Sequence, residues 1–157
     1  MNQDRLRELL HYDPFTGVFT RRVNRGRYKA GEVAGTVHHG YVIIGVCRVK
    51  YMAHRLAWLY VHGVWPKDEI DHINGMSNDN RIENLREATH IINAQNQRKA
   101  QRINKVGFLG VSPYFSKFLA QICANGKKHY LGAYSTPDLA HAAYVRAKRL
   151  LHPGGTL

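Results

Sequence analysis

The part of this 157-residue chain with the most chemical potential lies between residues 71 and 97. It begins with an adjacent aspartate and histidine, Asp71 and His72, and contains six asparagines. Asparagine is a poor helix former, so this density needs an explanation other than helix formation. Carboxylate and amide oxygens are hard ligands that suit Mg²⁺ or Mn²⁺, and a neutral imidazole can take a proton from water. The segment therefore has the residue types needed for metal-assisted hydrolysis.

Five of these asparagines fall into two groups. Asn74, Asn78 and Asn80 are expected in a turn-rich loop, because asparagine tolerates left-handed backbone and hydrogen-bonds its own chain. We assign these three to structure. Asn84 lies in a segment that the sequence predicts to be a strand, and Asn93 lies in a predicted short helix. Both can point into a site shared with the aspartate and histidine.

The order of these residues resembles the HNH endonucleases, in which two strands and a helix surround one metal ion (the ββα-metal arrangement). The matching positions are Asp71-His72, Asn84-Leu85-Arg86 and Asn93. The lead-in at residues 54–75 and the N-terminal motif YDPFTG resemble the phage and intron-encoded homing branch, so the resemblance spans residues 6–97. The closing position is asparagine rather than histidine, which favours an ion that prefers oxygen ligands.

The resemblance implies a role for each residue. Asp71 and Asn93 would hold one Mg²⁺ or Mn²⁺ ion per chain. His72 would act as the general base, and Asn84 would brace the loop and orient the imidazole. Arg86 is a candidate phosphate contact. The alternative is that Asp71 caps a turn and His72 is an ordinary loop histidine.

The charge of the chain points to a polyanionic partner. Lysine and arginine number 23 against 11 acidic residues, which gives a net charge of +12, and we expect the partner to be nucleic acid rather than a membrane. The HNH resemblance implies that this nucleic acid is double-stranded DNA. We find no apolar stretch of membrane-spanning length and no secretion signal. Cys47 and Cys123 form no metal-binding pair. We therefore expect a cytoplasmic protein, and the resemblance to the homing branch implies that a phage or mobile element encodes it.

Two basic segments lie outside the asparagine-rich region. Residues 21–29 contain five basic residues and no acid, which suits a loop that follows phosphates, although a solvated loop is equally compatible. Residues 98–106 are predicted to be a basic linker. The linker residues expected to neutralise phosphates are Arg98, Lys99, Arg102 and Lys105.

The elements that must position the candidate site are predicted to be small. A short helix is expected from Leu6 and a strand after Gly17. Many β-branched residues over 32–51 predict a small antiparallel sheet, and residues 53–62 show the spacing of a buried helix. His54, near the start of that helix, is expected to pack or to contact phosphate.

Residues 107–151 have a different pattern, predicted as two or three short strands followed by a helix from Pro137. They resemble the Apetala-two, or ethylene-response-factor, DNA-binding domain, in which a three-stranded sheet backed by one helix enters the major groove. The residues that carry this resemblance are Gly110-Val111, Lys117-Phe118, Ala120, Ile122, Tyr130-Leu131-Gly132 and the alanines of the helix.

Strand alternation predicts which side chains of this module face away from the helix. The outward residues expected to contact DNA are Ser112, Tyr114, Lys117, Gln121, Lys128 and Tyr130. The helix is expected to lie on the sheet through Leu139, Ala143, Ala147, Leu150 and Leu151. A generic α+β domain or a protein-contact module is the alternative.

The sequence thus predicts an α+β protein with two modules. Residues 1–97 would form an HNH nuclease domain with a β-rich N-terminal part, and residues 107–157 a DNA reader with a three-stranded antiparallel sheet packed on one helix. The function expected is that of a homing-type DNA endonuclease, acting as a monomer because each chain has one predicted metal site. A catalytically silent DNA-binding regulator and an RNA-binding or RNA-cleaving protein are the alternatives.

Overall fold

The computed structural model of the chain describes residues 1–97, 100 and 103–152. The described part is mixed α+β, with four α-helices and several small sheets. The chain divides into two compact units, Met1–His90 and Ile91–Leu157. Arg98, Lys99 and Arg102, which the sequence predicts to contact DNA, lie outside the described residues. No helix in the described ranges is both long and apolar enough to cross a membrane.

The first unit begins with helix α1 (Gln3–Leu9), followed by strand β1 (Leu10–Tyr12), which pairs antiparallel with β2 (Phe19–Arg21). Asn2 caps the helix, because its side-chain oxygen accepts a hydrogen bond from the backbone N–H of Arg5 at 3.0 Å. The expected helix and the strand after Gly17 are both present. Strand β1 was not predicted, since its three residues give too short a pattern.

A three-stranded antiparallel sheet follows, with strand order β3 (Thr36–His38), β4 (Tyr41–Val46) and β5 (Val49–Met52). It confirms the sheet predicted over residues 32–51. Helix α2 (Ala53–His62) starts directly after β5, and Gly63 ends it in the left-handed conformation. The sheet and α2 enclose the core of the unit with α1, β1 and β2. Its largest fully buried apolar side chains are Tyr12, Phe19, Leu6, Leu10, Ile44, Leu56 and Leu59.

The candidate catalytic residues lie on the last elements of this unit. Strands β6 (Glu69–His72) and β7 (Leu85–Ala88) form a two-stranded antiparallel sheet, and a 3₁₀ helix, η1 (Ile82–Asn84), precedes β7. The prediction that Asn84 lies in a strand is therefore wrong. The backbone N–H of Asn84 bonds to Arg81 O at 2.9 Å and closes a helical turn, so strand pairing starts one residue later.

Helix α3 (His90–Gln95) is the short helix predicted to carry Asn93. None of its side chains is buried. The boundary between the compact units falls at its start, whereas the sequence places the end of the nuclease domain at residue 97. A six-residue helix without a buried face contributes little packing to either unit, which explains the difference.

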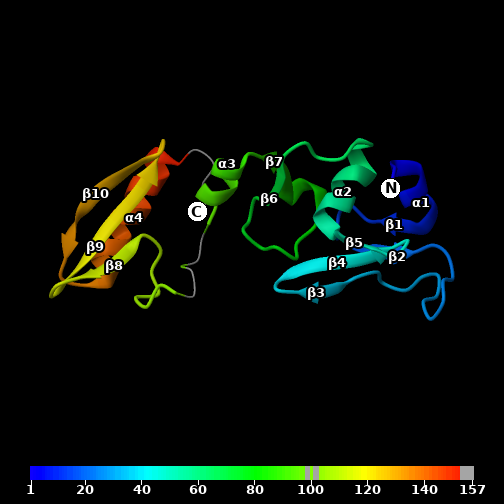
Figure 1. Cartoon of the computed structure of the whole chain (residues 1–157), viewed down its shortest axis with the longest axis horizontal. Coiled ribbons are helices and arrows are strands. Elements are labelled where there is room, and N and C mark those ends of the chain that lie inside the picture. The colour runs from blue at the N-terminus through cyan, green and yellow to red at the C-terminus, as the bar shows by residue number, and fades with distance from the viewer. Residues whose placement is uncertain (98–99, 101–102, 153–157) are drawn as a thin grey trace. The chain divides into compact units, whose positions relative to one another are not determined.

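The second unit contains a three-stranded antiparallel sheet of strand order β10 (Lys127–Tyr134), β9 (Lys117–Ala124) and β8 (Val111–Tyr114). Helix α4 (Pro137–Leu151) runs across one face of this sheet (Figure 1). Thr136 caps it, since the threonine Oγ1 accepts a hydrogen bond from Leu139 N at 3.3 Å. The buried centre of the unit consists of Val111, Ala120 and Ala140.

The predicted contact face of α4 is partly wrong. Leu139 and Leu150 are 53% and 81% exposed, whereas Ala140, Tyr144 and Lys148 are buried. These three are spaced four residues apart, so they form the stripe that meets the sheet. The prediction chose the leucines because they are the most apolar side chains of the helix. Instead the aliphatic part of Lys148 is buried, and its ammonium donates a hydrogen bond to the carbonyl of Gln97.

The turn after β1 packs against the loop between β6 and η1. Tyr12 Oη donates a hydrogen bond to Asn80 O at 2.7 Å, and Ile82 N donates to Pro14 O at 3.3 Å. Gly17 has φ +73°, and a Cβ built there would lie 2.5 Å from Arg81 N. This glycine therefore allows two backbone segments to approach more closely than any side chain permits.

We predict that Gly17→Ala lowers the free energy of unfolding by about 3 kcal/mol, because roughly 1–2 kcal/mol for left-handed backbone adds to roughly 1–3 kcal/mol for overpacking. Gly31→Ala is the matched control, since Gly31 also has positive φ but open space around it. Gly31→Ala should lose only the free energy that left-handed backbone costs an alanine. Urea denaturation measures the free energy of unfolding of both variants, and equal decreases would contradict the close approach at Gly17.

Candidate active site

Asp71 lies on β6 directly opposite Arg86 on β7. Arg86 donates two hydrogen bonds to Asp71 Oδ2, from Nε at 2.9 Å and from Nη2 at 2.7 Å. The aspartate is 3% exposed. A buried carboxylate requires such compensation, because burial of an unpaired charge is costly. Arg86, suggested by the sequence as a phosphate contact, thus neutralises the aspartate in this structure.

His72 is the next residue on β6 and faces away from Asp71, because successive strand residues point to opposite faces. Its Nε2 lies 3.4 Å from Asn80 Oδ1. Its ring lies edge-on to the ring of His54, with centroids 5.0 Å apart, and 6.2 Å from the ring of Tyr41. The imidazole therefore has a defined orientation in a mostly aromatic environment.

Burial lowers the pKa of both histidines. For His72 desolvation is the main cause, opposed by the hydrogen bond with Asn80 and by the charges of Asp71 and Asp79. Desolvation, aided by His72 and Arg55, lowers the pKa of His54 to about 4. Both rings are therefore neutral at pH 7. His54 Nδ1 is buried without a hydrogen-bond partner among the described residues.

Asn84 braces the loop between β6 and η1. Its Oδ1 accepts a hydrogen bond from Asn74 N at 2.9 Å, and its Nδ2 donates to Asp79 O at 2.8 Å. One buried side chain thus ties the beginning of the loop to its end. The residue hydrogen-bonded to the His72 imidazole is Asn80, a position that the sequence assigned to turn structure.

Asp79 stiffens the same loop. Its carboxylate accepts hydrogen bonds from Arg81 Nε at 2.9 Å and Arg81 Nη2 at 2.8 Å, and from Asn74 Nδ2 at 2.7 Å. These contacts, Arg81 first, lower the pKa of Asp79 to about 2. The carboxylate therefore stays ionised at any pH at which the protein would be assayed.

The donor set fits a metal ion that is shared with substrate better than a closed protein cage. The ranges that the structure describes contain no group of three or more His, Cys, Asp or Glu side chains arranged to hold a metal. Asp71 is the buried carboxylate of the site. Mg²⁺ commonly binds through one or two carboxylates, with water and phosphate oxygens as further ligands. Asn93, the second predicted ligand, belongs to the second compact unit.

The predicted DNA-contacting residues of the second unit share one face of its sheet. The strand register places Tyr114 opposite Lys117, Gln121 opposite Tyr130, and Cys123 opposite Lys128. Ala120, Ile122 and Ala124, which alternate with them on β9, are buried. The expected outward set, which is Ser112, Tyr114, Lys117, Gln121, Lys128 and Tyr130, therefore lies on the face opposite α4. Lys105, from the predicted linker, is exposed.

Sequence reasoning does not identify the contacts that three residues make with His72. The sequence assigns Asn80 to turn structure and indicates no role for Tyr41. It predicts that His54 packs or contacts phosphate, and the packing is confirmed, but not that its partner is His72. The available signal was weak: His54 is a histidine at the start of an otherwise apolar helix, and Asn80 follows the Asp-His pair in a loop already rich in asparagine. Only tertiary packing brings Tyr41 and His54 to His72.

We predict that the buried His54 makes the protein less stable in mild acid. Its pKa is about 4 when folded and near 6.5 when unfolded. Between these values the unfolded chain binds more protons, so stability falls as pH drops from 6.5 to 4, by about 3 kcal/mol in total.

Urea denaturation at several pH values, with EDTA present to exclude bound metal, measures this dependence. His54→Gln should flatten the curve, whereas His11→Gln, which changes an exposed histidine of the same unit, should leave it unchanged. An unaltered slope in His54→Gln would argue against a neutral buried ring at this position.

Comparison with known protein families locates the resemblance on this site. Residues 51–95 match a family described as HNH endonuclease, which supports a nuclease of the HNH type. The matched segment begins in β5 and ends in α3, so it contains all four candidate catalytic and metal-binding residues. Neither curated proteins nor solved structures give a match to the chain.

Proposed function

We propose that this chain is a metal-dependent DNA endonuclease of the HNH homing type, which hydrolyses phosphodiester bonds in double-stranded DNA. The observation that carries the proposal is the buried pair Asp71 and His72 at the end of β6, within the segment that matches HNH endonucleases. Burying a carboxylate and an imidazole at successive positions of one strand costs stability, and groups whose pKa burial shifts, as it does for His72, concentrate at catalytic sites. A net charge of +12 agrees with a polyanionic substrate.

His72 is the proposed general base. Asn80 Nδ2 donates to Asn78 O at 3.2 Å, which turns Asn80 Oδ1 toward His72. An amide oxygen can only accept, so His72 Nε2 carries the hydrogen and Nδ1 holds the lone pair. Nδ1 then takes a proton from a water molecule as the water oxygen attacks phosphorus. Asn80 acts as the positioning residue by fixing the tautomer.

Asp71 and Asn93 are the proposed metal ligands, with phosphate oxygens and water completing the coordination. When bound there, Mg²⁺ or Mn²⁺ would stabilise the charge on the phosphate and on the departing O3′. Asp71 contributes a carboxylate whose neighbour Arg86 already offsets its charge. Such a site should bind the ion weakly alone and more tightly with DNA present.

The second unit is the proposed DNA-recognition module. Its outward sheet face combines Lys117 and Lys128, which can bind phosphate or guanine, with Gln121, which can pair with adenine. The basic segment between residues 98 and 106 would neutralise phosphates without reading sequence. We propose a first domain ending near residue 97 and a second starting near residue 107.

A catalytically silent DNA-binding regulator is the competing function. The observation in its favour is that Arg86 engages the carboxylate of Asp71 through two hydrogen bonds. A plasmid-nicking assay with Mg²⁺ separates the two functions, because only the endonuclease converts supercoiled plasmid to nicked circles.

We predict that His72→Ala reduces plasmid nicking by at least 100-fold, the lower end of the usual contribution of general-base catalysis. DNA binding should change little, because the substitution removes no cationic charge. His11→Ala is the matched control, as it removes an exposed histidine from the same unit. Nicking at the wild-type rate by His72→Ala would refute the general-base role.

We also predict that Asp71→Asn raises the Mg²⁺ concentration needed for half-maximal nicking by at least tenfold, since it removes an anionic ligand. Arg86→Gln is the control, because it breaks the same ion pair but keeps the carboxylate. Its Mg²⁺ requirement should stay the same or fall. If both variants raise the Mg²⁺ requirement equally and lower the midpoint of unfolding equally, Asp71 acts only through its ion pair with Arg86 and is not a metal ligand.

A further inference from the structure

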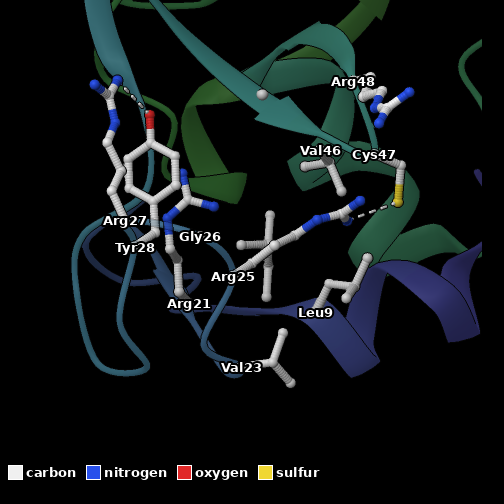
Figure 2. Close-up of a pocket in the computed structure, with 12 residues that line it drawn as sticks. Leu9, Arg21, Val23, Arg25, Gly26, Arg27, Tyr28, Val46, Cys47 and Arg48 are labelled. Atoms are coloured by element: carbon white, nitrogen blue, oxygen red, sulfur yellow. Dashed lines mark hydrogen bonds between the residues drawn. The ribbon is translucent and has the colours of Figure 1, made fainter.

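A basic pocket lies in the first unit, lined by the end of α1, by the loop after β2 and by the turn between β4 and β5 (Figure 2). Its volume is about 450 Å³, which is within the usual range of small-ligand sites. Leu9, Val23 and Val46 provide apolar walls. Four arginines also line it, namely Arg21, Arg25, Arg27 and Arg48.

The loop after β2, which carries Arg25 and Arg27, has a defined backbone structure. Arg25 and Tyr28 exchange backbone hydrogen bonds at 2.9 and 3.2 Å, and Gly26 supplies the positive φ, +59°, of the tight turn between them. Ala30 N donates to Asn24 Oδ1 at 2.8 Å and closes the loop. Residues 22–29 are all exposed, so the loop is solvated, but these hydrogen bonds give its backbone a defined shape in the pocket wall.

The opposite wall is the turn at Cys47 and Arg48, whose φ values are +52° and +67°. Arg25 extends across the pocket and donates from Nη1 to Cys47 Sγ at 3.3 Å (Figure 2). This hydrogen bond is the main cause that lowers the pKa of the Cys47 thiol. An anion at this position is therefore already favoured by the surrounding charge.

The positive charge of the pocket lacks a counter-ion. No carboxylate lines it, and within the described residues none of the four arginines forms an ion pair. Arg21 lies over the ring of Tyr28, with its Cζ 3.9 Å from the centroid, but its buried Nε has no hydrogen-bond acceptor in the described part of the chain. Each guanidinium offers five N–H donors. Phosphate oxygens would accept hydrogen bonds from those N–H groups that have no acceptor in the protein.

The pocket is separate from the candidate active site. Strand β4 begins at Tyr41, whose ring contacts His72, and ends at Val46 in the pocket wall. Five residue steps of about 3.4 Å place the two ends roughly 17 Å apart. A phosphate bound in the pocket would therefore not be the one that is cleaved.

We propose that this pocket binds a sugar–phosphate unit of the DNA backbone, several nucleotides from the scissile bond, and so anchors the substrate on the nuclease unit itself. The arginines receive the phosphate, and the apolar wall contacts the sugar. Such a contact is independent of base sequence. This inference rests on the proposed DNA substrate, but its test does not depend on cleavage.

Binding of a fluorescent 30-base-pair duplex to the full-length His72→Ala protein in EDTA, across a KCl series, tests the pocket. The double variant Arg25→Gln/Arg48→Gln should weaken binding by roughly tenfold and reduce the slope of log affinity against log salt by about 0.9, the value for one phosphate. Arg22→Gln/Lys29→Gln is the matched control, because these two cations flank the same loop without lining the pocket. If both double variants lose the same affinity for the duplex, the proposal is overturned, because general electrostatic attraction by the cations of the loop would then explain binding. Unchanged affinity in the pocket variant would also overturn it.

Alkylation of Cys47 gives a second readout that needs no arginine variant. In a Cys123→Ser background, saturating duplex should slow the reaction of Cys47 with iodoacetamide at least fivefold. Unchanged alkylation in the DNA complex would overturn the proposal, as would protection by inorganic pyrophosphate or anionic lipid vesicles but not by duplex. If wild-type protein fails to nick plasmid with Mg²⁺ while these binding results hold, the nuclease proposal fails and the pocket stands.

Discussion

The two hydrogen bonds of the Asn84 side chain hold the candidate site together. They join Asn74, at the start of the loop after β6, to Asp79, near its end. Asn80, which is hydrogen-bonded to His72, follows Asp79 directly, so the direction of the imidazole depends on the shape of this loop. The side chain at position 84 must accept from the Asn74 N–H and donate to the Asp79 carbonyl. An ionised aspartate of the same size cannot donate, and leucine can do neither.

The N-terminal hairpin supports the same loop from outside. Tyr12 and Gly17 contact it through a hydrogen bond and a close backbone approach, and the rings of Tyr12, Phe19 and Tyr60 pack together beneath them. The first ninety residues therefore act as one unit, in which strands remote in sequence restrain the segment that carries the histidine. Neutral buried histidines make that unit dependent on pH, because their environment disfavours the charged form.

Sequence periodicity predicted the elements with strong local signals. Apolar spacing predicted helix α2, and the β-branched residues predicted the sheet over 32–51. Two positions were harder: Asn84 falls in a 3₁₀ turn closed by its local backbone bond to Arg81, and packing on the sheet buries Lys148 of α4 rather than Leu150. At the site, residue types identified Asp71 and His72 as candidates. The His54 and Tyr41 rings approach His72 from α2 and β4, which no pattern along the chain encodes.

The backbone conformation of the turn between β4 and β5 lowers the stability of the fold. Two-residue hairpin turns with positive φ at both positions favour Asn-Gly, yet Cys47 and Arg48 occupy them here. Left-handed backbone costs a side chain of this type about 1–2 kcal/mol. A turn of this sequence gives up conformational stability in order to present a thiol and a guanidinium. Engineering for thermostability would therefore select Asn-Gly at these two positions and, in doing so, remove part of the basic pocket, so the hairpin is a place where heat resistance and retention of a polyanion oppose each other.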